Sequence, residues 1–474
     1  MGTLVGIAVC VGNRRAVATA PAEVEPTGIM TFADPAVQAL CAKTWGDGTN
    51  ITYEQAREVT EIPKNWAKDN KTITSFNEIK YFKNLLYIRE RAFTNCSNLV
   101  INEISLPNLL LIELSAFANC TVLGCELLNL PSCETLGTTV FYNTTIKRVV
   151  MPKLKTIADS QKDYGCFQKI PNLESVTLRD IEYIGDYSFK DATKLVLDSI
   201  EYPNLTRIGI SAFAGCTFTL NKAILPNCKK IETSAFNGCT SLALTSLELP
   251  LCTSIGNNAF NNCTSMALTT LELPQCTTIG NEAFHSCSSM ALTSLELPQC
   301  TSIGNKAFNG CSSMALTSLD LPLCTSIGNS AFNGCPLLSE ITFQNVTTVG
   351  TQAFRGTGIS KIKLPSVETM SAVSNYDGIF SFCPNLVLVD LGENCSSIGN
   401  ESFGRGVGTS GKNITLICRA STPPTLGGSI ISKGLVKATI GEIYVPDESV
   451  EAYKTATNWS AYANIILPLS QYKG

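Results

Sequence analysis

The chain has 474 residues, of which 44% are hydrophobic and only 16% are charged, against ~25% charged in an average globular protein. Its net charge of -4 at pH 7 gives no electrostatic basis for binding nucleic acid. No apolar run approaches the ~20 residues that a membrane-spanning helix needs, so we expect neither a nucleic-acid partner nor a membrane span.

Residues 1–28 begin with an apolar stretch, Leu4 to Val11, which is followed by Arg14 and Arg15. A secretory signal peptide carries its positive charges before the apolar core, so the order here is reversed, although Ala16 to Ala20 would suit a cleavage site. The alternative is a β-prone segment that stays on the chain and pairs with another chain or with the neighbouring cap. We predict an N-terminal anchor or docking segment and a linker over this range.

Residues 29–75 are predicted to form a small helical cap. Asp34 before Pro35 has the pattern of a helix N-cap followed by proline at the first helical position. Thr52 and Gln55 have the spacing of a capping box, which indicates that a second helix begins there.

Residues 76–440 contain a repeat with a period of 24 residues. The pattern L-x-L-P-x-C-x-x-I-G-x-x-A-F-x-x-C occurs from Leu247, Leu271 and Leu295 and, with changes at its variable positions, from Leu319. A fixed period of this size is typical of a solenoid. One coil cannot bury its apolar face alone, so neighbouring coils must supply the core.

The repeat also indicates which side chains point inward. Leu247 and Leu249 alternate along a short strand and are expected to point into the coil, whereas Glu248 between them points out. Pro250 ends the strand because it has no N–H to donate. Phe260 follows on the second side of the coil.

One Phe recurs in each coil, so we expect a Phe column through the core and about 14 coils, spanning ~65 Å at ~4.8 Å per strand. The predicted column comprises Phe93, Phe117, Phe141, Phe167, Phe189, Phe213, Phe236, Phe260, Phe284, Phe308, Phe332, Phe354 and Phe403. Its spacing is irregular at two places, which predicts insertions at Ser160–Tyr164 and Ser371–Gly378.

The repeat motif resembles the BspA-type leucine-rich repeat family, which is found in surface and secreted proteins of gut and oral bacteria, in some protozoa and in gut phages. The resemblance covers nearly the whole chain. It implies an α/β-type repeat solenoid with short parallel strands. It also implies a recognition or adhesion protein rather than an enzyme.

The loop from Trp45 to Ile51 resembles a degenerate calcium loop of the same family. Asp47 and Gly48 remain, but Gln55 stands where the bidentate Glu would be, and a hard cation needs six or more oxygen ligands. We therefore expect a plain connector between two helices, and neither a metal nor another cofactor.

Many of the 21 cysteines fall into two columns with the period of the coil. One column follows the Phe by three residues and the other follows L-x-L-P: Cys239, Cys263, Cys287, Cys311 and Cys335, and Cys252, Cys276, Cys300 and Cys324. No C-x-x-C pair is present, so the usual zinc signature is missing. We expect buried thiols that act as small apolar side chains; disulfides between neighbouring coils are the alternative.

Residues 441–474 are predicted to close the C-terminal end with a strand and a helix that begins near Pro446. Trp459, Tyr462 and Ile465 are expected to cover the open end of the core. The run Tyr-Val-Pro-x-x-x-Val-x-x-Tyr from Tyr444 resembles the closing segment of BspA-type proteins.

Candidate catalytic groups are scarce, and we predict no catalytic residue. His285 is the only histidine and takes a repeat position that sister coils fill with Asn, so we expect a surface residue. The stretch from Gly406 to Lys412 nearly matches a phosphate loop, but Asn413 replaces the Ser or Thr that would bind magnesium, and a strand pattern follows. We expect a glycine-rich turn there.

Four acidic residues, Glu248, Glu272, Glu296 and Asp320, take the same outward position in successive coils. Stacked in register, they would form an acidic column in which each like-charged neighbour costs ~0.2–1 kcal/mol. One explanation is that duplication copied a solvated Glu. The alternative is a binding stripe for a repeating ligand, such as a glycan or a basic protein segment, with or without a bridging cation.

Together these patterns predict a non-catalytic recognition or adhesion protein that presents an extended leucine-rich repeat surface to a protein or glycan on a cell surface. The alternative is a phage virion structural or host-recognition protein, anchored to other virion proteins through residues 1–28. Both hypotheses place the protein outside the producing cell, on a virion or on a bacterial surface or secreted.

Overall fold

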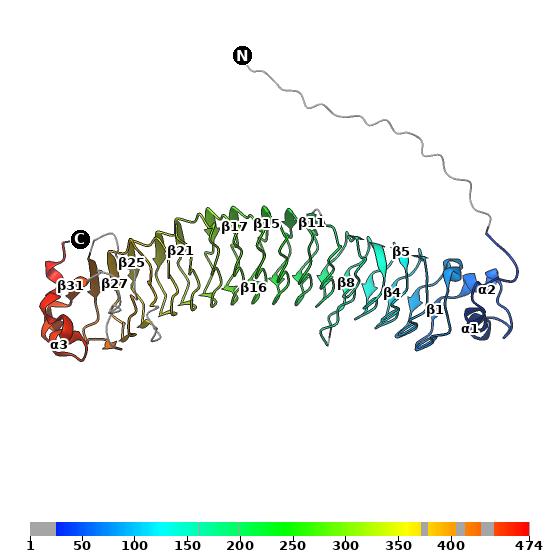
Figure 1. Cartoon of the computed structure of the whole chain (residues 1–474), viewed down its shortest axis with the longest axis horizontal. Coiled ribbons are helices and arrows are strands. Elements are labelled where there is room, and N and C mark those ends of the chain that lie inside the picture. Colours follow the sequence, from blue (N-terminus) through cyan, green and yellow to red (C-terminus); the bar gives the residue numbers. More distant parts are fainter. Residues whose placement is uncertain are drawn as a thin grey trace, which may run out of the picture.

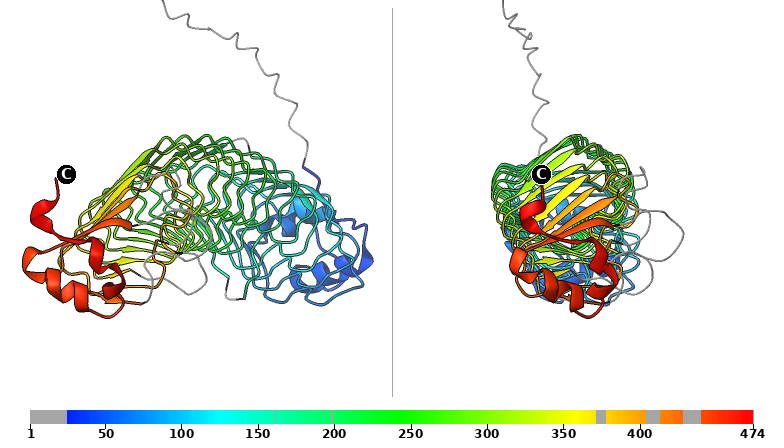
Figure 2. Two further views of the ribbon diagram at one scale, coloured as in Figure 1. Left: turned by 60° about the vertical axis from the view of Figure 1, so that its left-hand side comes forward. Right: turned by 90° about the vertical axis from the view of Figure 1, so that its left-hand side faces the viewer.

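The structure is a computed structural model that describes residues 25–160, 162–197, 199–370, 378–403, 413–427 and 440–473. Figure 1 shows a long, arched stack of coils, with α1 and α2 at one end and α3 at the other. Viewed along the rod, as in the right-hand panel of Figure 2, successive coils lie behind one another with nearly the same outline. The solenoid predicted from the 24-residue period is confirmed.

The N-terminal end carries α1 (Pro35–Trp45), α2 (Tyr53–Glu58) and the 3₁₀ helix η1 (Asn77–Tyr81). Asp34 caps α1, because its carboxylate accepts the N–H of Ala36 at 2.7 Å. Thr52 and Gln55 form the predicted capping box at α2, with reciprocal hydrogen bonds of 3.2 and 2.9 Å. Local capping chemistry therefore fixes both helix starts.

One side of the stack is an uninterrupted parallel sheet of sixteen two-residue strands, one per coil, which we call the continuous sheet. Its strands are β1 (Glu61–Ile62), β2 (Tyr87–Ile88), β4 (Leu111–Ile112), β6 (Thr135–Leu136), β8 (Thr156–Ile157), β10 (Tyr183–Ile184), β12 (Arg207–Ile208), β14 (Lys230–Ile231), β16 (Ser254–Ile255), β18 (Thr278–Ile279), β20 (Ser302–Ile303), β22 (Ser326–Ile327), β24 (Thr348–Val349), β26 (Thr369–Met370), β28 (Ser397–Ile398) and β30 (Thr425–Leu426).

A second side, which we call the segmented side, carries the L-x-L strands in five separate parallel sheets. These sheets comprise β3 (Glu103–Ser105), β5 (Cys125–Asn129), β7 (Ile146–Val150) and β9 (Ser175–Thr177); β11 (Ser199–Glu201), β13 (Lys222–Ile224) and β15 (Ser246–Glu248); β17 (Thr270–Glu272) and β19 (Ser294–Glu296); β21 (Ser318–Leu321) and β23 (Glu340–Phe343); and β25 (Lys361–Leu364), β27 (Leu388–Leu391), β29 (Ile414–Cys418), β31 (Ile440–Val445) and β32 (Ile466–Pro468).

The two sides lie at different positions on the arch. In Figure 1, β11, β15 and β17 follow the upper, convex edge, while β16 lies nearer the concave edge. Strands on the convex edge must cover a longer path with the same number of coils. Because parallel strands pair at a spacing of ~4.8 Å, that side breaks into short sheets while the other stays continuous.

The Phe column runs through the core between these sides. Neighbouring rings are nearly parallel; Phe236 and Phe260, for example, have centroids 5.2 Å apart and planes inclined by 4°. The predicted column is confirmed but was incomplete, because Phe380 stacks between Phe354 and Phe403 at 5.9 Å from each. The insertion before Phe380 had broken the spacing on which the prediction relied.

The predicted number of about 14 coils was too low, since the continuous sheet has sixteen strands. Phe380 accounts for one missed coil. The first coil, which contains β1, has Trp66 beside the Phe column, with its ring 5.5 Å from that of Phe93. Within the described residues, the coils from β2 to β30 contain turns, and the α-helices of the fold lie at its two ends.

The Ile-Gly step of the repeat reflects a close approach of coils. A Cβ added at Gly280 would lie 2.6 Å from the backbone of Asn257 and of Gly256 in the preceding coil. Non-bonded heavy atoms cannot approach so closely without a backbone shift, so glycine is required where the chain leaves β18, whereas other coils carry a larger residue at this position, such as Glu232 after β14.

The C-terminal end carries a strand, a helix and one further strand. After β31 the chain forms the 3₁₀ turn η2 (Asp447–Ser449) and α3 (Val450–Thr455), which begins just beyond Pro446. Trp459 is fully buried on the core, and Tyr462 and Ile465 pack beside it. The sequence did not predict β32, which returns to pair in parallel with β31.

All cysteines of the described residues are buried free thiols. In the Phe-linked column, the thiol of Cys263 donates to the carbonyl of Phe236 at 3.2 Å, and Cys287 repeats this bond to Phe260 at 3.1 Å. Burial raises the pKa of the Cys252 thiol to about 12 and that of Cys263 well above its usual value. These thiols are therefore protonated core side chains, as predicted from their spacing.

Candidate functional site

The four residues of the predicted acidic column all lie exposed on the segmented side, on β15, β17, β19 and β21. Glu272 and Glu296 face each other in register across the β17–β19 pair. Glu248 and Asp320 occupy the same position on β15 and β21, but these strands are not hydrogen-bonded to β17 and β19. The column is therefore one paired step flanked by two breaks in the sheet.

The break between β15 and β17 forms a groove of about 320 Å³ that Glu248 and Glu272 both line. Among the described residues Leu249 N–H has no backbone acceptor, whereas the equivalent N–H of Leu273 donates to the Glu296 carbonyl at 3.1 Å. A ligand in this groove would therefore meet the carboxylates of Glu248 and Glu272 and the backbone N–H of Leu249. No salt bridge involves the four acidic residues within the described parts of the chain.

The charge of this outward position changes along the rod. Ile224 precedes Glu248 in register and Thr342 follows Asp320. In the next sheet the position holds Lys363, which lies opposite Asp390. The uninterrupted run of acidic residues is therefore four coils long, although Glu201 and Asp390 also occupy this position elsewhere on the rod.

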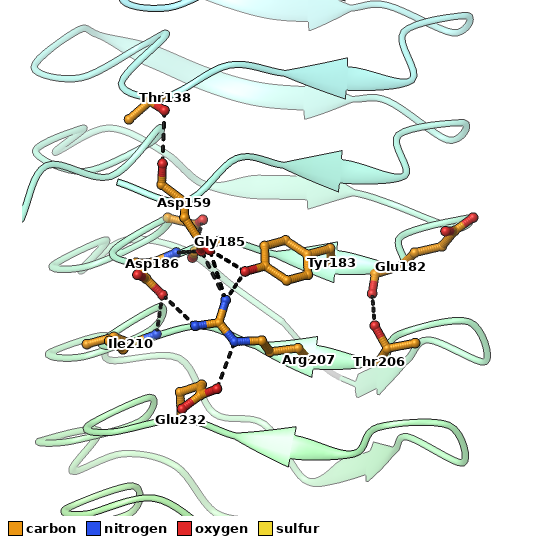
Figure 3. A network of polar contacts seen from close by, with 11 residues as sticks. Thr138, Asp159, Glu182, Tyr183, Gly185, Asp186, Thr206, Arg207, Ile210 and Glu232 are labelled. Atoms are coloured by element: carbon orange, nitrogen blue, oxygen red, sulfur yellow. Dashed lines mark hydrogen bonds and ion pairs between the residues drawn. The ribbon is translucent and has the colours of Figure 1, made fainter. Parts of the chain in front are cut away.

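A polar network that the sequence did not predict lies on the continuous sheet, centred on Arg207 of β12 (Figure 3). Its guanidinium group contacts Asp159 at 3.0 Å, Asp186 at 3.2 Å and Glu232 at 2.9 Å. Tyr183 of β10 lies in the same network, where it hydrogen-bonds Asp159 and accepts a hydrogen bond from Arg207. The single guanidinium group of Arg207 thus forms ion pairs with three carboxylates.

The network has a structural origin in a column of Asn and Asp side chains. In the regular coils the side chain of Asn257 accepts the N–H of Asn281 at 2.8 Å, and Asn281 accepts that of Asn305 at 2.7 Å. Asp186 makes the equivalent bond to Ile210 N–H at 2.7 Å, and Asp159 to Asp186 N–H at 3.1 Å. Aspartate in place of asparagine adds negative charge that Arg207 neutralises.

The electrostatics of Asp186 agree with this explanation. Asp186 is only 9% exposed. Burial, together with the neighbouring carboxylates of Asp159 and Glu232, raises its pKa to about 6, although the hydrogen bond from Ile210 N–H opposes the shift. A perturbed carboxyl can mark a catalytic site, but here every partner belongs to the ladder between coils, so the network is structural.

The other candidate residues are used within the fold. His285 is half-buried rather than fully exposed, with Nδ1 3.1 Å from Asn261 Oδ1 in the preceding coil. Asp47 closes the loop between α1 and α2 by accepting the N–H groups of Thr49 and Asn50, which lower its pKa. The glycine-rich stretch from Gly406 to Lys412 lies outside the described residues.

In the described parts of the chain, no three His, Cys, Asp or Glu side chains are grouped so that they could hold a metal ion. Among the same residues, no helix is long and apolar enough to cross a membrane.

The repeat itself assigns the family. The model of the BspA type leucine-rich repeat region matches residues 59–162, 161–291, 241–322 and 301–416. These matches cover most of the chain, and the protein belongs to the BspA-type leucine-rich repeat family. No curated protein matches the sequence.

Solved structures with a similar arrangement include a leucine-rich repeat protein from Bacteroides ovatus ATCC 8483, at 19% identity over 82% of this chain and 85% of that one, with a TM-score of 0.47. A leucine rich cell surface protein from Faecalibacterium prausnitzii A2-165 is 20% identical over 74% and 87%, with a TM-score of 0.37. The pneumococcal vaccine antigen PcpA is 16% identical over 87% and 83%, with a TM-score of 0.32.

Proposed function

We propose that this protein is a non-catalytic recognition or adhesion protein that acts outside the producing cell, with the segmented side as its binding surface. The observation that carries this proposal is the recurrence of an exposed acidic residue at one strand position in four successive coils. Thr side chains join neighbouring coils on both sides, as Thr277 Oγ1 does by donating to the Thr253 carbonyl at 3.1 Å and Thr293 Oγ1, beside β19, by donating to the Thr269 carbonyl at 3.1 Å. On the segmented side, the acidic column remains exposed and without an ion pair among the described residues.

The acidic column is proposed as the contact for a repeating partner, which is a glycan or a basic protein segment on a cell surface. Exposed like charges at neighbouring strand positions destabilise a sheet, and the side-chain carboxylates of Glu272 and Glu296 make no hydrogen bond or ion pair among the described residues. A partner that brings positive charge or hydroxyl donors would remove this cost on binding.

The test replaces the acidic column and measures binding of the purified chain to a glycan array and to a lysine-rich peptide. The test variant carries Glu248→Gln, Glu272→Gln, Glu296→Gln and Asp320→Asn. The control variant makes the same change in charge at four exposed acids that have no ion pair among the described residues: Glu174→Gln, Glu182→Gln, Glu368→Gln and Glu448→Gln.

We expect the test variant to lose at least about tenfold in affinity for the bound partner and the control variant to keep it. Equal affinity of both variants would remove the acidic column from the binding site. Release of a shortened glycan by the wild-type chain would contradict the non-catalytic role.

A phage virion protein anchored through residues 1–28 is the second candidate, and the order of apolar stretch and Arg14–Arg15 in the sequence favours it over a signal peptide. Mass spectrometry of the native N-terminus distinguishes the two. Loss of the first residues at a cleavage site near Ala20 would support export, and their retention in purified particles would support virion assembly.

A further inference from the structure

A second groove, of about 890 Å³, lies on the segmented side near the C-terminal end. It is located where β23 and β25 belong to different sheets, so it opens at a break like that between β15 and β17. Its lining includes Lys361 and Lys363 of β25, together with Glu340 of β23. A volume of this size is within the range of small-ligand sites.

Two lysines in this groove have no anionic partner in the part of the chain that the structure describes. Lys361 and Lys363 both point outward from β25 and are exposed. Lys363 lies in register with Asp390 on β27. Both carboxylate oxygens of Asp390 nevertheless accept hydrogen bonds from Arg419, whose Nε and Nη2 donate at 2.8 and 2.9 Å. Within the described residues, neither lysine has a carboxylate within 4 Å.

The Asp390–Arg419 pair orients the guanidinium group at the edge of the groove. The Asp390 side chain is only 9% exposed, whereas that of Arg419 is 41% exposed. An ion pair of this kind, with one partner buried and the other exposed, contributes little net stability, because the Asp390 carboxylate must be desolvated. Its effect here is to hold Arg419 rigidly, with its third nitrogen, Nη1, outside the bidentate pair.

The same groove also presents acceptors. The carboxylates of Glu340 and Glu393 line it, as do the polar side chains of Thr342 and Asn394, and all four residues are exposed. Phe343, the one aromatic residue in the lining, is buried, with 4% of its surface accessible. A ligand that fits must therefore bring an anionic group for the lysines and hydroxyl donors for the carboxylates.

We propose that this groove binds a sugar that carries a carboxylate, such as a uronic acid within an oligosaccharide. Lys361, Lys363 and Arg419 bind the sugar carboxylate, and Glu340 and Glu393 accept hydrogen bonds from its hydroxyl groups. A densely anionic polymer is disfavoured by these two carboxylates. An acidic peptide lacks the hydroxyl donors, and the groove offers no apolar pocket for its side chains, whereas protein interfaces are enriched in aromatic contacts.

This inference rests on the proposed recognition function but not on the acidic column, whose last member, Asp320, lies on the strand before the groove, in register with the lining residue Thr342. Isothermal titration calorimetry with a trimer of galacturonic acid tests it on the full chain. We expect a Kd below about 1 mM for the trimer and no measurable binding of its fully methyl-esterified form, which has the same hydroxyl pattern but no charge. This comparison needs no variant.

Lys361→Gln with Lys363→Gln is the matching variant, and we expect it to weaken binding at least about tenfold. Lys229→Gln with Lys230→Gln is the control, because it removes two charges from exposed positions beside and on β14 of the continuous sheet; its Kd should stay within about twofold of wild type. Unchanged thermal midpoints would show that both variants fold.

Binding that survives esterification, or that falls equally in both lysine variants, would overturn the site, as would the absence of binding to the wild-type chain. A glutamate-rich peptide that binds more tightly than the trimer and depends on Lys361 and Lys363 would overturn the sugar assignment. If the trimer is recovered shortened, the non-catalytic function fails instead, so the two failures are distinguishable.

Discussion

The two sides of this solenoid are built from the same repeats but obey different rules of pairing. On the continuous sheet every regular coil makes the same bond, such as Gly256 N–H to the Ile231 carbonyl at 2.8 Å and Gly280 N–H to that of Ile255 at 2.9 Å. On the segmented side, Leu273 N–H is bonded to the next coil but Leu249 N–H is not.

Leu249 and Leu273 lie in almost identical sequences, so local sequence does not decide which strands pair. The arch of the whole stack accounts for the presence of breaks, because the convex side must stretch over the same number of coils, but it does not select which neighbouring strands separate. Breaks in pairing leave grooves, and both grooves lined by the charged residues proposed for binding lie at such breaks. Recognition is therefore expected where the repeat geometry is least regular.

The largest predicted effect concerns the core that both sides share. Phe284→Ala should lower the free energy of unfolding by ~3–5 kcal/mol, because it leaves a cavity in a fully buried column. Chemical denaturation measures this loss. Leu251→Ala, which truncates a side chain that is 43% exposed, is the control and should change stability by less than ~0.5 kcal/mol. Equal midpoints for the two variants would place Phe284 outside the core.

The second prediction concerns the network on the continuous sheet. Arg207→Met should lower the free energy of unfolding by ~1–3 kcal/mol, because it leaves Asp159, Asp186 and Glu232 close together without a cation. Arg148→Met removes an exposed arginine that has no ion pair among the described residues and is the control. Adding Asp186→Asn to Arg207→Met should restore part of the loss, and no recovery would contradict the proposed repulsion.

A smaller effect compares the two sides directly. Asn281→Ala removes the acceptor for Asn305 N–H and should cost ~0.5–1.5 kcal/mol. Thr270→Ala, at an exposed position of the segmented side, removes no hydrogen bond found among the described residues and should cost almost nothing. Urea denaturation of both variants measures the difference, and a larger loss for Thr270→Ala would reverse our assignment of structural and binding sides.

The smallest effect is a dependence on pH. The pKa of Asp186 is raised to about 6 in the folded chain, against ~3.9 for an unfolded aspartate. The folded state thus binds the extra proton, so this contribution to stability is present below about pH 4 and is lost as the pH rises through about 6. Asp186→Asn keeps a side-chain oxygen that can accept the Ile210 N–H and should gain stability relative to wild type over that window. Parallel curves for the two proteins from pH 4 to 7 would contradict the shift.

Much of the fold followed from the sequence because its determinants repeat at short range. The alternation of Leu247 and Leu249, the capping box at Thr52 and the spacing of Phe260 from Cys263 are each set within one coil. Phe380 was missed because an insertion displaced it from the expected spacing, although its ring stacks like the others.

The candidate sites were less accessible to sequence reasoning because they depend on relations between distant coils. Asp159, Asp186 and Arg207 come together over a separation of 48 residues. The only signal was aspartate at a position that other coils fill with Asn257 or its equivalents. The acidic column was visible in the repeats, but the breaks in the sheet between its members follow from the curvature of the stack.

Amide hydrogen exchange at equivalent residues tests the central contrast most directly. The account predicts slow exchange for Gly256, Gly280 and Gly304 on the continuous sheet, since each N–H is bonded to the preceding coil. On the segmented side it predicts slow exchange for Leu273 but fast exchange for Leu249 and Leu297, despite their matching sequences. Equally slow exchange of these three leucine amides would mean that the segmented side is a continuous sheet and would contradict the account.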